Sequence, residues 1–130
     1  MESQAGWCNG PAELDWVLPE GLQQLVVGGD EAMVAEIIET FQRDTAMRLE
    51  LLQSAVERGA REEVRAQAHA IKGGAAQVGV NGIAVVCRQI ETRAREGEAA
   101  EIQELAARLA TEFQAVARLI QTGNRWAIGR

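Results

Sequence analysis

The sequence contains few of the residues that build specialised chemical sites. It has no tyrosine, one histidine and two cysteines among 130 residues, and aromatic side chains make up only 4%. A metal site needs several clustered Cys, His or acidic ligands, so one histidine and the distant Cys8 and Cys87 predict neither a zinc site nor a disulfide framework. We interpret both cysteines as reduced, in a cytoplasmic protein. The low aromatic content predicts a mostly aliphatic core.

Long hydrophobic runs and an excess of positive charge are also missing. No apolar run approaches the roughly 20 residues that cross a bilayer, and residues 1–15 lack the charged start and apolar centre of a signal peptide. The formal net charge is −6, whereas nucleic acids are bound through clustered Lys and Arg. We therefore expect no nucleic-acid partner and no direct membrane contact.

Apolar residues at helical spacing, separated by glycines, dominate what the sequence does contain. They predict a short helix after Pro19 and four longer helices, which run from Asp30 to Gly59, over residues 61–78, from Asn81 to Gly97 and over about 99–122. Asp30 and Asn81 are expected to act as N-caps. Connections of two to four residues favour antiparallel neighbours. The expected fold is all-α, an up-down-up-down four-helix bundle with a short additional N-terminal helix.

One domain accounts for nearly the whole chain. The length is typical of a single domain. We expect residues 1–15 to form a flexible lead-in, residues 16–122 to form the bundle domain, and residues 123–130 to form a C-terminal tail. Trp16 and Leu18 are expected to dock on the body of the bundle.

The stretch "AHAIKGGAAQVG", residues 68–79, holds the only histidine. On a helical wheel, His69 points about 140° away from the centre of the apolar stripe, so it should face solvent. The residues that form this stripe are Val64, Ala68, Ile71, Ala75 and Val78. Short side chains, including Ala76, and the cations of Arg65 and Lys72 border the imidazole. Gly73 and Gly74 weaken the helix by about 2 kcal/mol together, and this cost suggests a use.

His69, Lys72, Gly73 and Gly79 follow the pattern H-x-x-K-G with a further glycine six positions later. This pattern resembles the signature of histidine-containing phosphotransfer (HPt) domains. The resemblance continues into "CRQIETRAREG", residues 87–97, and back into "GGDEAMVAEIIETF", residues 28–41. It covers roughly residues 18–120.

The resemblance implies roles for individual residues. His69 would be the phosphoacceptor, Lys72 would stabilise the phosphorylated state, and Gly73 would leave clearance for a receiver domain. Gly79 is similar to the family's helix terminator, and Arg65 would add to the positive field. Many members carry Ser or Thr hydroxyls next to the motif glycine, where this chain has Gly74, Ala75 and Ala76.

The implied function is that of a phosphorelay intermediate, which accepts a phosphoryl group from a receiver-domain aspartyl phosphate and passes it to another receiver. Response-regulator receiver domains are the expected partners, with a hybrid histidine kinase as a further one. The domain would bind no cofactor, because Mg²⁺ belongs to the partner receiver, and it would be a phosphocarrier without kinase activity of its own. Docking would use the surface around His69, including the outward side of residues 31–45.

Two alternatives stay open at this point. "HAIKGGAA" also resembles the phosphoacceptor domain of chemotaxis-type histidine kinases, which takes phosphate directly from an ATP-binding partner. A pseudo-HPt protein, which binds receivers without carrying phosphate, is the other. The presence of both His69 and Lys72 argues against the second alternative.

Overall fold

The computed structural model describes residues 16–121, and its regular secondary structure is helical. The predicted lead-in, residues 1–15, and the predicted tail, residues 123–130, lie outside the described residues. The helices are α2 (Glu20–Val27), α3 (Glu31–Arg58), α4 (Arg61–Val78), α5 (Asn81–Glu96) and α6 (Ala99–Gln121). None of these helices is long and apolar enough to cross a membrane.

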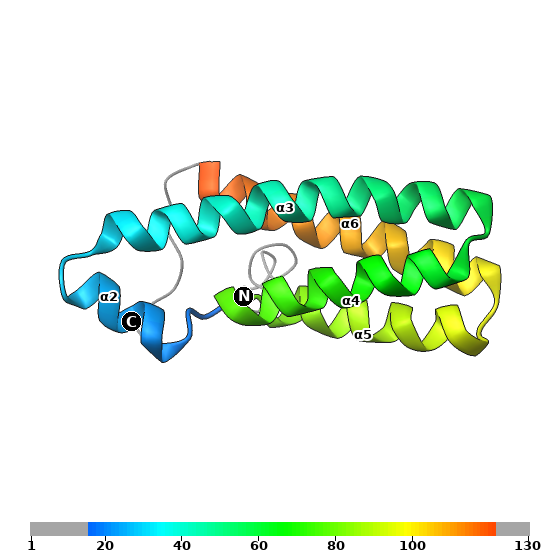
Figure 1. Cartoon of the computed structure of the whole chain (residues 1–130), viewed down its shortest axis with the longest axis horizontal. Coiled ribbons are helices and arrows are strands. Elements are labelled where there is room, and N and C mark those ends of the chain that lie inside the picture. The colour runs from blue at the N-terminus through cyan, green and yellow to red at the C-terminus, as the bar shows by residue number, and fades with distance from the viewer. Residues whose placement is uncertain (1–15, 122–130) are drawn as a thin grey trace, which may run out of the picture.

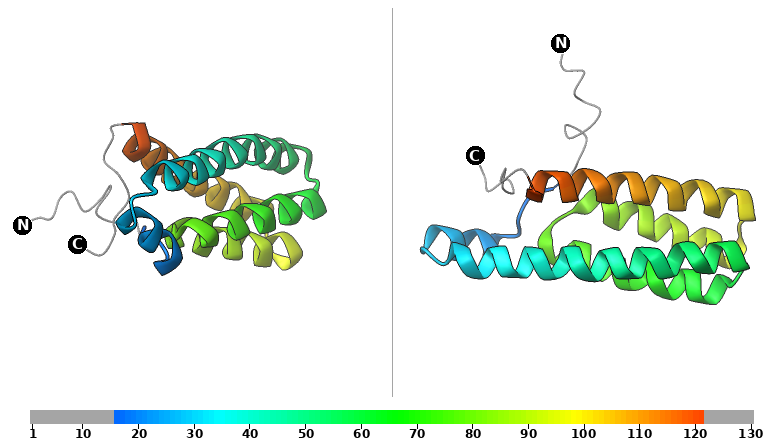
Figure 2. Two further views of the ribbon diagram at one scale, coloured as in Figure 1. Left: turned by 60° about the vertical axis from the view of Figure 1, so that its left-hand side comes forward. Right: turned by 90° about the horizontal axis from the view of Figure 1, so that it is seen from above.

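Helices α3 to α6 form an antiparallel four-helix bundle (Figures 1 and 2). Each helix packs on the next in chain order, and α3 also contacts α6, so the bundle closes. The short connections leave no room for a crossover, which is why consecutive helices are antiparallel neighbours. The predicted up-down-up-down bundle with an additional N-terminal helix is confirmed.

Helix α3 is the longest element, and its 28 residues span about 42 Å at 1.5 Å per residue. Its N-terminal part extends past the end of α4, and α2 packs against α3. Figure 1 shows α2 continuing the line of α4 alongside α3. The short N-terminal helix therefore covers apolar surface of α3 that the bundle leaves open.

The core is aliphatic, as the composition predicts. In α4 the five stripe residues named above are all buried. Helices α3, α5 and α6 bury similar stripes, and Trp16 and Leu18 dock on the bundle at 5% and 1% exposure, as predicted. The helical period also assigns Val56, Leu105 and Ile120 to the stripes of α3 and α6, but these three side chains are only partly buried. Ala55 and Ala106, the neighbours of the first two, are buried in their place.

The turn between α4 and α5 is built on Gly79. Its φ of 84° lies in the left-handed region that glycine adopts without strain. A Cβ at this position would collide with the carbonyl of Val17. Residues 16 and 17 contact this turn through two hydrogen bonds. Val17 N donates to Gly79 O at 3.2 Å, and Trp16 Nε1 donates to Val78 O at 2.8 Å. The predicted helix end at Gly79 is therefore confirmed.

The predicted N-caps differ from the structure. Helix α5 begins at Asn81, and Val80 occupies the N-cap position without a side-chain cap. Val80 is fully buried and forms a β-bridge with Trp16. These contacts fix Val80 as the residue before the first turn of α5, so Asn81 becomes the first helical residue and not the cap. Asp30 does occupy the N-cap of α3, but its side chain makes no capping hydrogen bond.

Gly79→Ala should destabilise the domain far more than Gly59→Ala. Both glycines have positive φ, but a Cβ at Gly59 meets open space. We expect about 1 kcal/mol of lost stability for Gly59→Ala, from the left-handed conformation alone, and about 3 kcal/mol for Gly79→Ala, which must also displace the Val17 carbonyl. Urea unfolding of both variants measures the difference, and equal losses would contradict the role assigned to Val17.

Candidate functional site

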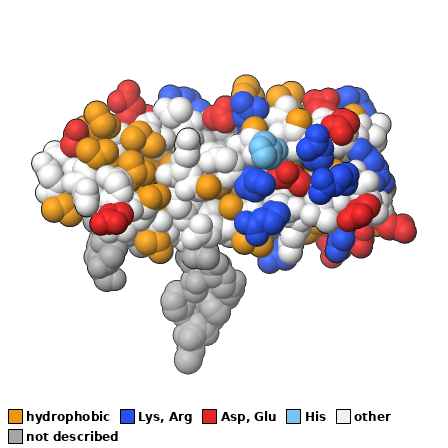
Figure 3. Space-filling view, turned by 60° about the horizontal axis from the view of Figure 1, so that its bottom comes forward, with side chains coloured by type: hydrophobic (Ala, Val, Ile, Leu, Met, Phe, Trp, Pro, Cys, Tyr) orange, Lys and Arg blue, Asp and Glu red, His pale blue; other side chains and the backbone are white. Residues whose placement is uncertain are grey.

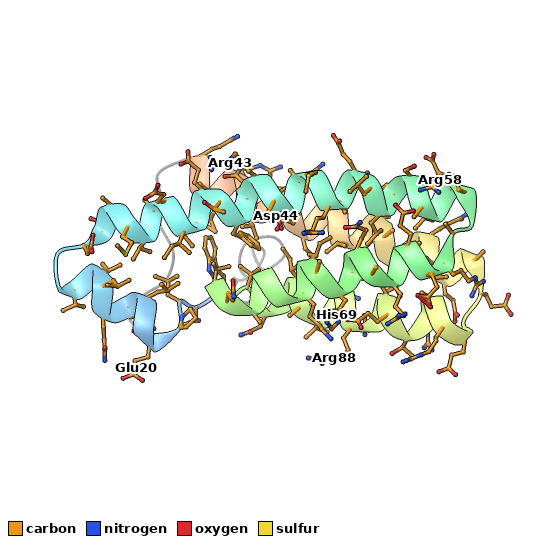
Figure 4. All side chains as sticks on the ribbon, viewed as in Figure 1. Glu20, Arg43, Asp44, Arg58, His69 and Arg88 are labelled. Atoms are coloured by element: carbon orange, nitrogen blue, oxygen red, sulfur yellow. The ribbon has the colours of Figure 1, made fainter. Side chains whose placement is uncertain are left out.

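His69 stands on the outer surface of α4, near the middle of the helix. Its neighbours Ala68 and Ile71 are buried in the core at 0% and 1% exposure, and this anchoring turns the imidazole outward. The His69 side chain is 68% exposed. Figure 4 shows it on the side of α4 that faces away from α3. The predicted exposure of the imidazole is confirmed.

A carboxylate from α5 lies beside the imidazole. Glu91 Oε1 is 3.3 Å from His69 Nδ1, and Glu91 Oε2 is 2.8 Å from Lys72 Nζ. The Glu91 side chain is only 14% exposed. Oε2 is shielded from solvent and makes no aligned hydrogen bond among the described residues, so the charge of Lys72 is what compensates it. Glu91 therefore joins the histidine and the lysine of the motif into one cluster.

Sequence reasoning missed Glu91, although a signal for it was present. The turn at Gly79 and Val80 makes α4 and α5 an antiparallel hairpin, so residues equally distant from Val80 lie at the same level. His69 precedes Val80 by eleven residues and Glu91 follows it by eleven. This register, applied to the predicted helices, would have placed the two side chains opposite each other.

Glu91 is ionised at neutral pH. Burial by itself raises the pKa of this carboxyl, but the contacts with Lys72 and then with His69 outweigh burial and hold the pKa below its usual value. An ionised carboxylate can only accept hydrogen bonds, so the hydrogen in this contact must belong to the imidazole nitrogen. His69 therefore carries its proton on Nδ1, and the lone pair of Nε2 is free.

The other motif residues fall into separate groups. A Cβ at Gly73 would meet nothing within 4 Å, so the surface beside His69 is open there. Arg65 does not join the cluster around Glu91, because its guanidinium pairs with Glu62 at 3.1 Å. Ala76 is exposed, one turn further along α4.

A groove between α3 and α4 lies next to this surface. Gly74 forms part of it, and a Cβ at Gly74 would only make an ordinary contact with Phe41 at 3.7 Å. The groove has a volume of about 420 Å³, and Met33, Ile37 and Phe41 give it an apolar floor and rim. Met33 is 47% exposed, which is unusual for a large apolar side chain. Neither helix glycine is required by packing within the described residues.

The comparison with protein families decides the identity of this fold and site. The family model of the Hpt domain matches residues 36–119. The chain belongs to the HPt domain family. HPt domains act in two-component signalling, so the chain has a phosphotransfer role there. A search of the curated proteins found no match.

Solved HPt structures share the architecture. The histidine-containing phosphotransfer protein B of Pseudomonas aeruginosa is 27% identical with a TM-score of 0.71, and the match covers 82% of this chain and 93% of that one. The maize phosphotransfer protein ZmHP2 is 23% identical with a TM-score of 0.73, covering 82% and 87%. The HPT domain of a sensor hybrid histidine kinase from Shewanella is 15% identical with a TM-score of 0.64, covering 82% and 92%. At these identities the last two support the fold alone.

Within residues 16–121 the other reactive groups offer no second site. Cys87 is buried, and burial followed by the nearby charge of Glu91 raises its pKa to about 12, so the thiol stays protonated. No group of three or more His, Cys, Asp or Glu side chains within residues 16–121 is arranged to hold a metal ion. The cluster of His69, Lys72 and Glu91 is therefore the chemically distinctive part of the described surface.

The tautomer of His69 should depend on Glu91. In the native protein with a neutral imidazole, nitrogen NMR should show a protonated Nδ1 and an unprotonated Nε2 on His69. Glu91→Ala removes the acceptor, so both tautomers should appear. Glu62→Ala, which removes an exposed carboxylate from the same face of α4, is the matched control and should leave the native pattern. A native Nε2–H tautomer would contradict the assignment.

Proposed function

We propose that His69 accepts a phosphoryl group from the aspartyl phosphate of a receiver domain and passes it to the aspartate of another. The observation that carries this proposal is an exposed imidazole whose Nδ1 is held by Glu91 and whose Nε2 faces open surface. Membership of the HPt family supports it. The proposal makes the chain a phosphocarrier, with no kinase activity of its own.

The reaction is a direct displacement at phosphorus. The Nε2 lone pair of His69 attacks, the bond between phosphorus and the aspartyl oxygen breaks, and the aspartate leaves as a carboxylate. The ring gains positive charge because Nδ1 keeps its hydrogen, and the carboxylate of Glu91 stabilises that charge at 3.3 Å. Transfer to the next receiver is the same step in reverse.

Lys72 is placed to neutralise the transferred group. It follows His69 by three residues, so both side chains leave the same face of α4. Its ammonium has three donors, and the ion pair with Glu91 uses one direction only. The remaining donors can bind the oxygens of a phosphoryl group on Nε2. Gly74 and Ala76 have no hydroxyl group that could bind the phosphoryl oxygens, so Lys72 has few other side chains to share this binding.

The catalytic metal belongs to the partner. Phosphoryl transfer depends mainly on positioning and charge neutralisation, and a receiver supplies its own Mg²⁺ for the aspartyl phosphate. The HPt side contributes a nucleophile on a rigid helix. The open space at Gly73 and the apolar groove between α3 and α4 suit a partner surface that must come close to the ring. The buried thiol of Cys87 fits the reduced cytoplasm that we propose as the location.

The proposal also covers the partners. Response-regulator receivers are the donors and acceptors, and a hybrid histidine kinase is the expected source of the phosphoryl group. In the Shewanella protein an HPT domain is itself part of a sensor hybrid histidine kinase. A kinase-type phosphoacceptor domain would instead be labelled directly by an ATP-binding partner, and a pseudo-HPt would bind receivers without labelling.

His69→Gln should abolish phosphorylation. Incubation with phosphorylated receivers of the source organism should label the native protein, and the label should be acid-labile and base-stable because it is a phosphohistidine. Glutamine keeps the size and polarity of the side chain but has no nucleophilic nitrogen. Label on the variant would refute the assignment of His69. Native protein that binds a receiver but takes no label from any would favour the pseudo-HPt function.

Gly73→Gln should slow transfer while leaving the fold intact. A side chain at this exposed helix position meets nothing within the domain, and glutamine is a better helix former than glycine by up to about 1 kcal/mol. Stability should therefore stay equal or rise, while the rate from a phosphorylated receiver falls because the partner is obstructed. Gly21→Gln, at an equally open glycine of α2, is the control. Transfer by Gly73→Gln at the native rate would mean that clearance at this position is not needed.

A further inference from the structure

Two arginines of α5 have no partner in a region where the other cations are paired. Lys72 is held by Glu91, and Arg65 is held by Glu62. The side chains of Arg88 and Arg95 are exposed, and their guanidinium groups make no ion pair or hydrogen bond with another residue in the range 16–121. A chain with net charge −6 has enough acidic side chains to pair them, so the position of these two cations calls for an explanation.

The hairpin register places both arginines at the site. Arg88 precedes Glu91 by three residues and Arg95 follows it by four, so they lie one turn to either side of Glu91 on the same face of α5. By the equal distances from Val80, Arg88 lies level with Lys72, and Arg95 lies level with Arg65. Figure 3 shows Lys and Arg side chains gathered around the single histidine, and Figure 4 labels Arg88 beside His69.

The two sides of His69 differ in charge. On the α3 side, the charged residues that line the α3–α4 groove are Glu36 and Asp44, both acidic, of which Asp44 is paired with Arg48 at 2.9 Å. On the α5 side, Arg88 continues into a second groove, of about 600 Å³, between α5 and α6, where the other charged residues are Arg93, Arg108, Glu101 and Glu104, so that cations exceed anions by one. Arg93 and Arg108 have loose acidic partners at 3.7 Å, whereas Arg88 has none among the described residues. An acidic partner is therefore attracted to the α5 side and repelled from the α3 side.

We propose that Arg88 and Arg95 form a docking site for the carboxylate cluster around a receiver's phosphorylation pocket, and that they orient the receiver with this cluster over α5. The inference rests on the proposed phosphotransfer function. It adds which side of His69 the acidic rim of the partner occupies, and it assigns the apolar groove between α3 and α4 to a part of the receiver without acidic charge.

The chemistry of the partner fits this charge pattern. A pocket that holds Mg²⁺ by carboxylates and carries a dianionic phosphoryl group has more negative charge than one Mg²⁺ neutralises. Arginine suits such a surface because its planar guanidinium pairs with carboxylates and phosphates through two parallel hydrogen bonds. Two unpaired arginines are too few to hold a phosphate backbone, which needs many such contacts. Charges of this kind at the rim of an interface act mainly on the association rate.

The test compares Arg88→Glu with Arg118→Glu. Arg118 is another exposed arginine without a partner among the described residues, but it lies in the last turn of α6, away from the site. Both changes alter the net charge equally. The donor is the phosphorylated receiver that labels His69 fastest, and the measured quantity is the second-order rate of transfer. Arg88→Glu should slow transfer about tenfold at about 0.01 M ionic strength, and the Arg118→Glu rate should stay near native.

Added salt and a second variant sharpen the result. At about 1 M ionic strength, where the Debye length is about 3 Å, the rates of all variants should converge. Arg95→Glu should behave like Arg88→Glu, and the double variant should be slower than either. Equal rates for Arg88→Glu and Arg118→Glu at low salt would overturn the inference, and so would a tenfold loss that persists at high salt.

Labelling by phosphoramidate separates this inference from the proposed function. A small phosphodonor needs no docking surface, so Arg88→Glu and Arg95→Glu should be labelled on His69 at the native rate. If the native protein accepts phosphate from phosphoramidate and from a receiver but Arg88→Glu transfers normally, the docking site is wrong and the phosphocarrier function stands. If His69 accepts phosphate from neither donor, the proposed function itself fails.

Discussion

The left-handed turn at Gly79 fixes the relation between the two helices that make the site. Because Gly79 reverses the chain within two residues, α4 and α5 are forced into a single register, and His69 meets Glu91 at equal distance from the turn. The Val17 N–H donates to Gly79 O and the indole N–H of Trp16 donates to Val78 O, and these two bonds hold the turn from outside the hairpin. A slip of one residue at this turn would rotate Glu91 by about 100° around α5, away from the imidazole. The chemistry of the site therefore depends on a backbone conformation that lies ten residues away from it.

Glu91 is the residue through which the site balances its charges. As a largely buried carboxylate it would be costly alone, but Lys72 and His69 compensate it from α4. In the phosphorylated state that we propose, Lys72 would lie between two anions, the phosphoryl group and Glu91, and the positively charged ring would donate its Nδ1 hydrogen to Glu91. The positive charge gained by the ring would then compensate Glu91 when the Lys72 ammonium turns partly toward the phosphoryl group. The charge of Glu91 would therefore be compensated both before and after phosphorylation, without a large movement of α4 or α5.

The helices and their faces followed from the sequence because burial in a bundle obeys the 3.6-residue period. The orientation of His69 is of this local kind, since Ala68 and Ile71 fix it within one helix turn. Glu91 is not local, because its partners are some twenty residues away, and only the register of the hairpin shows them. The N-cap expected at Asn81 failed for a related reason: Val80 is drawn into the core and toward Trp16, so tertiary burial overrides the capping preference. The resemblance to the HPt motif identified the face of α4 that carries His69 and Lys72. It could not show that Arg65 pairs with Glu62 instead of joining the cluster around Glu91.

Gly73, Gly74 and Gly79 differ in what the structure requires of them. Gly79 is needed by the backbone, since any Cβ there collides with the neighbouring segment. Gly74 lines the groove over Phe41, where a methyl group would fit but would make the groove shallower. Gly73 has no structural reason within the described residues, and it still costs α4 about 1 kcal/mol relative to alanine. The buried stripe of α4 is large enough to carry that cost, so the helix can keep a bare patch beside the imidazole. The absence of a side chain at Gly73 is therefore consistent with the clearance for a partner that we propose.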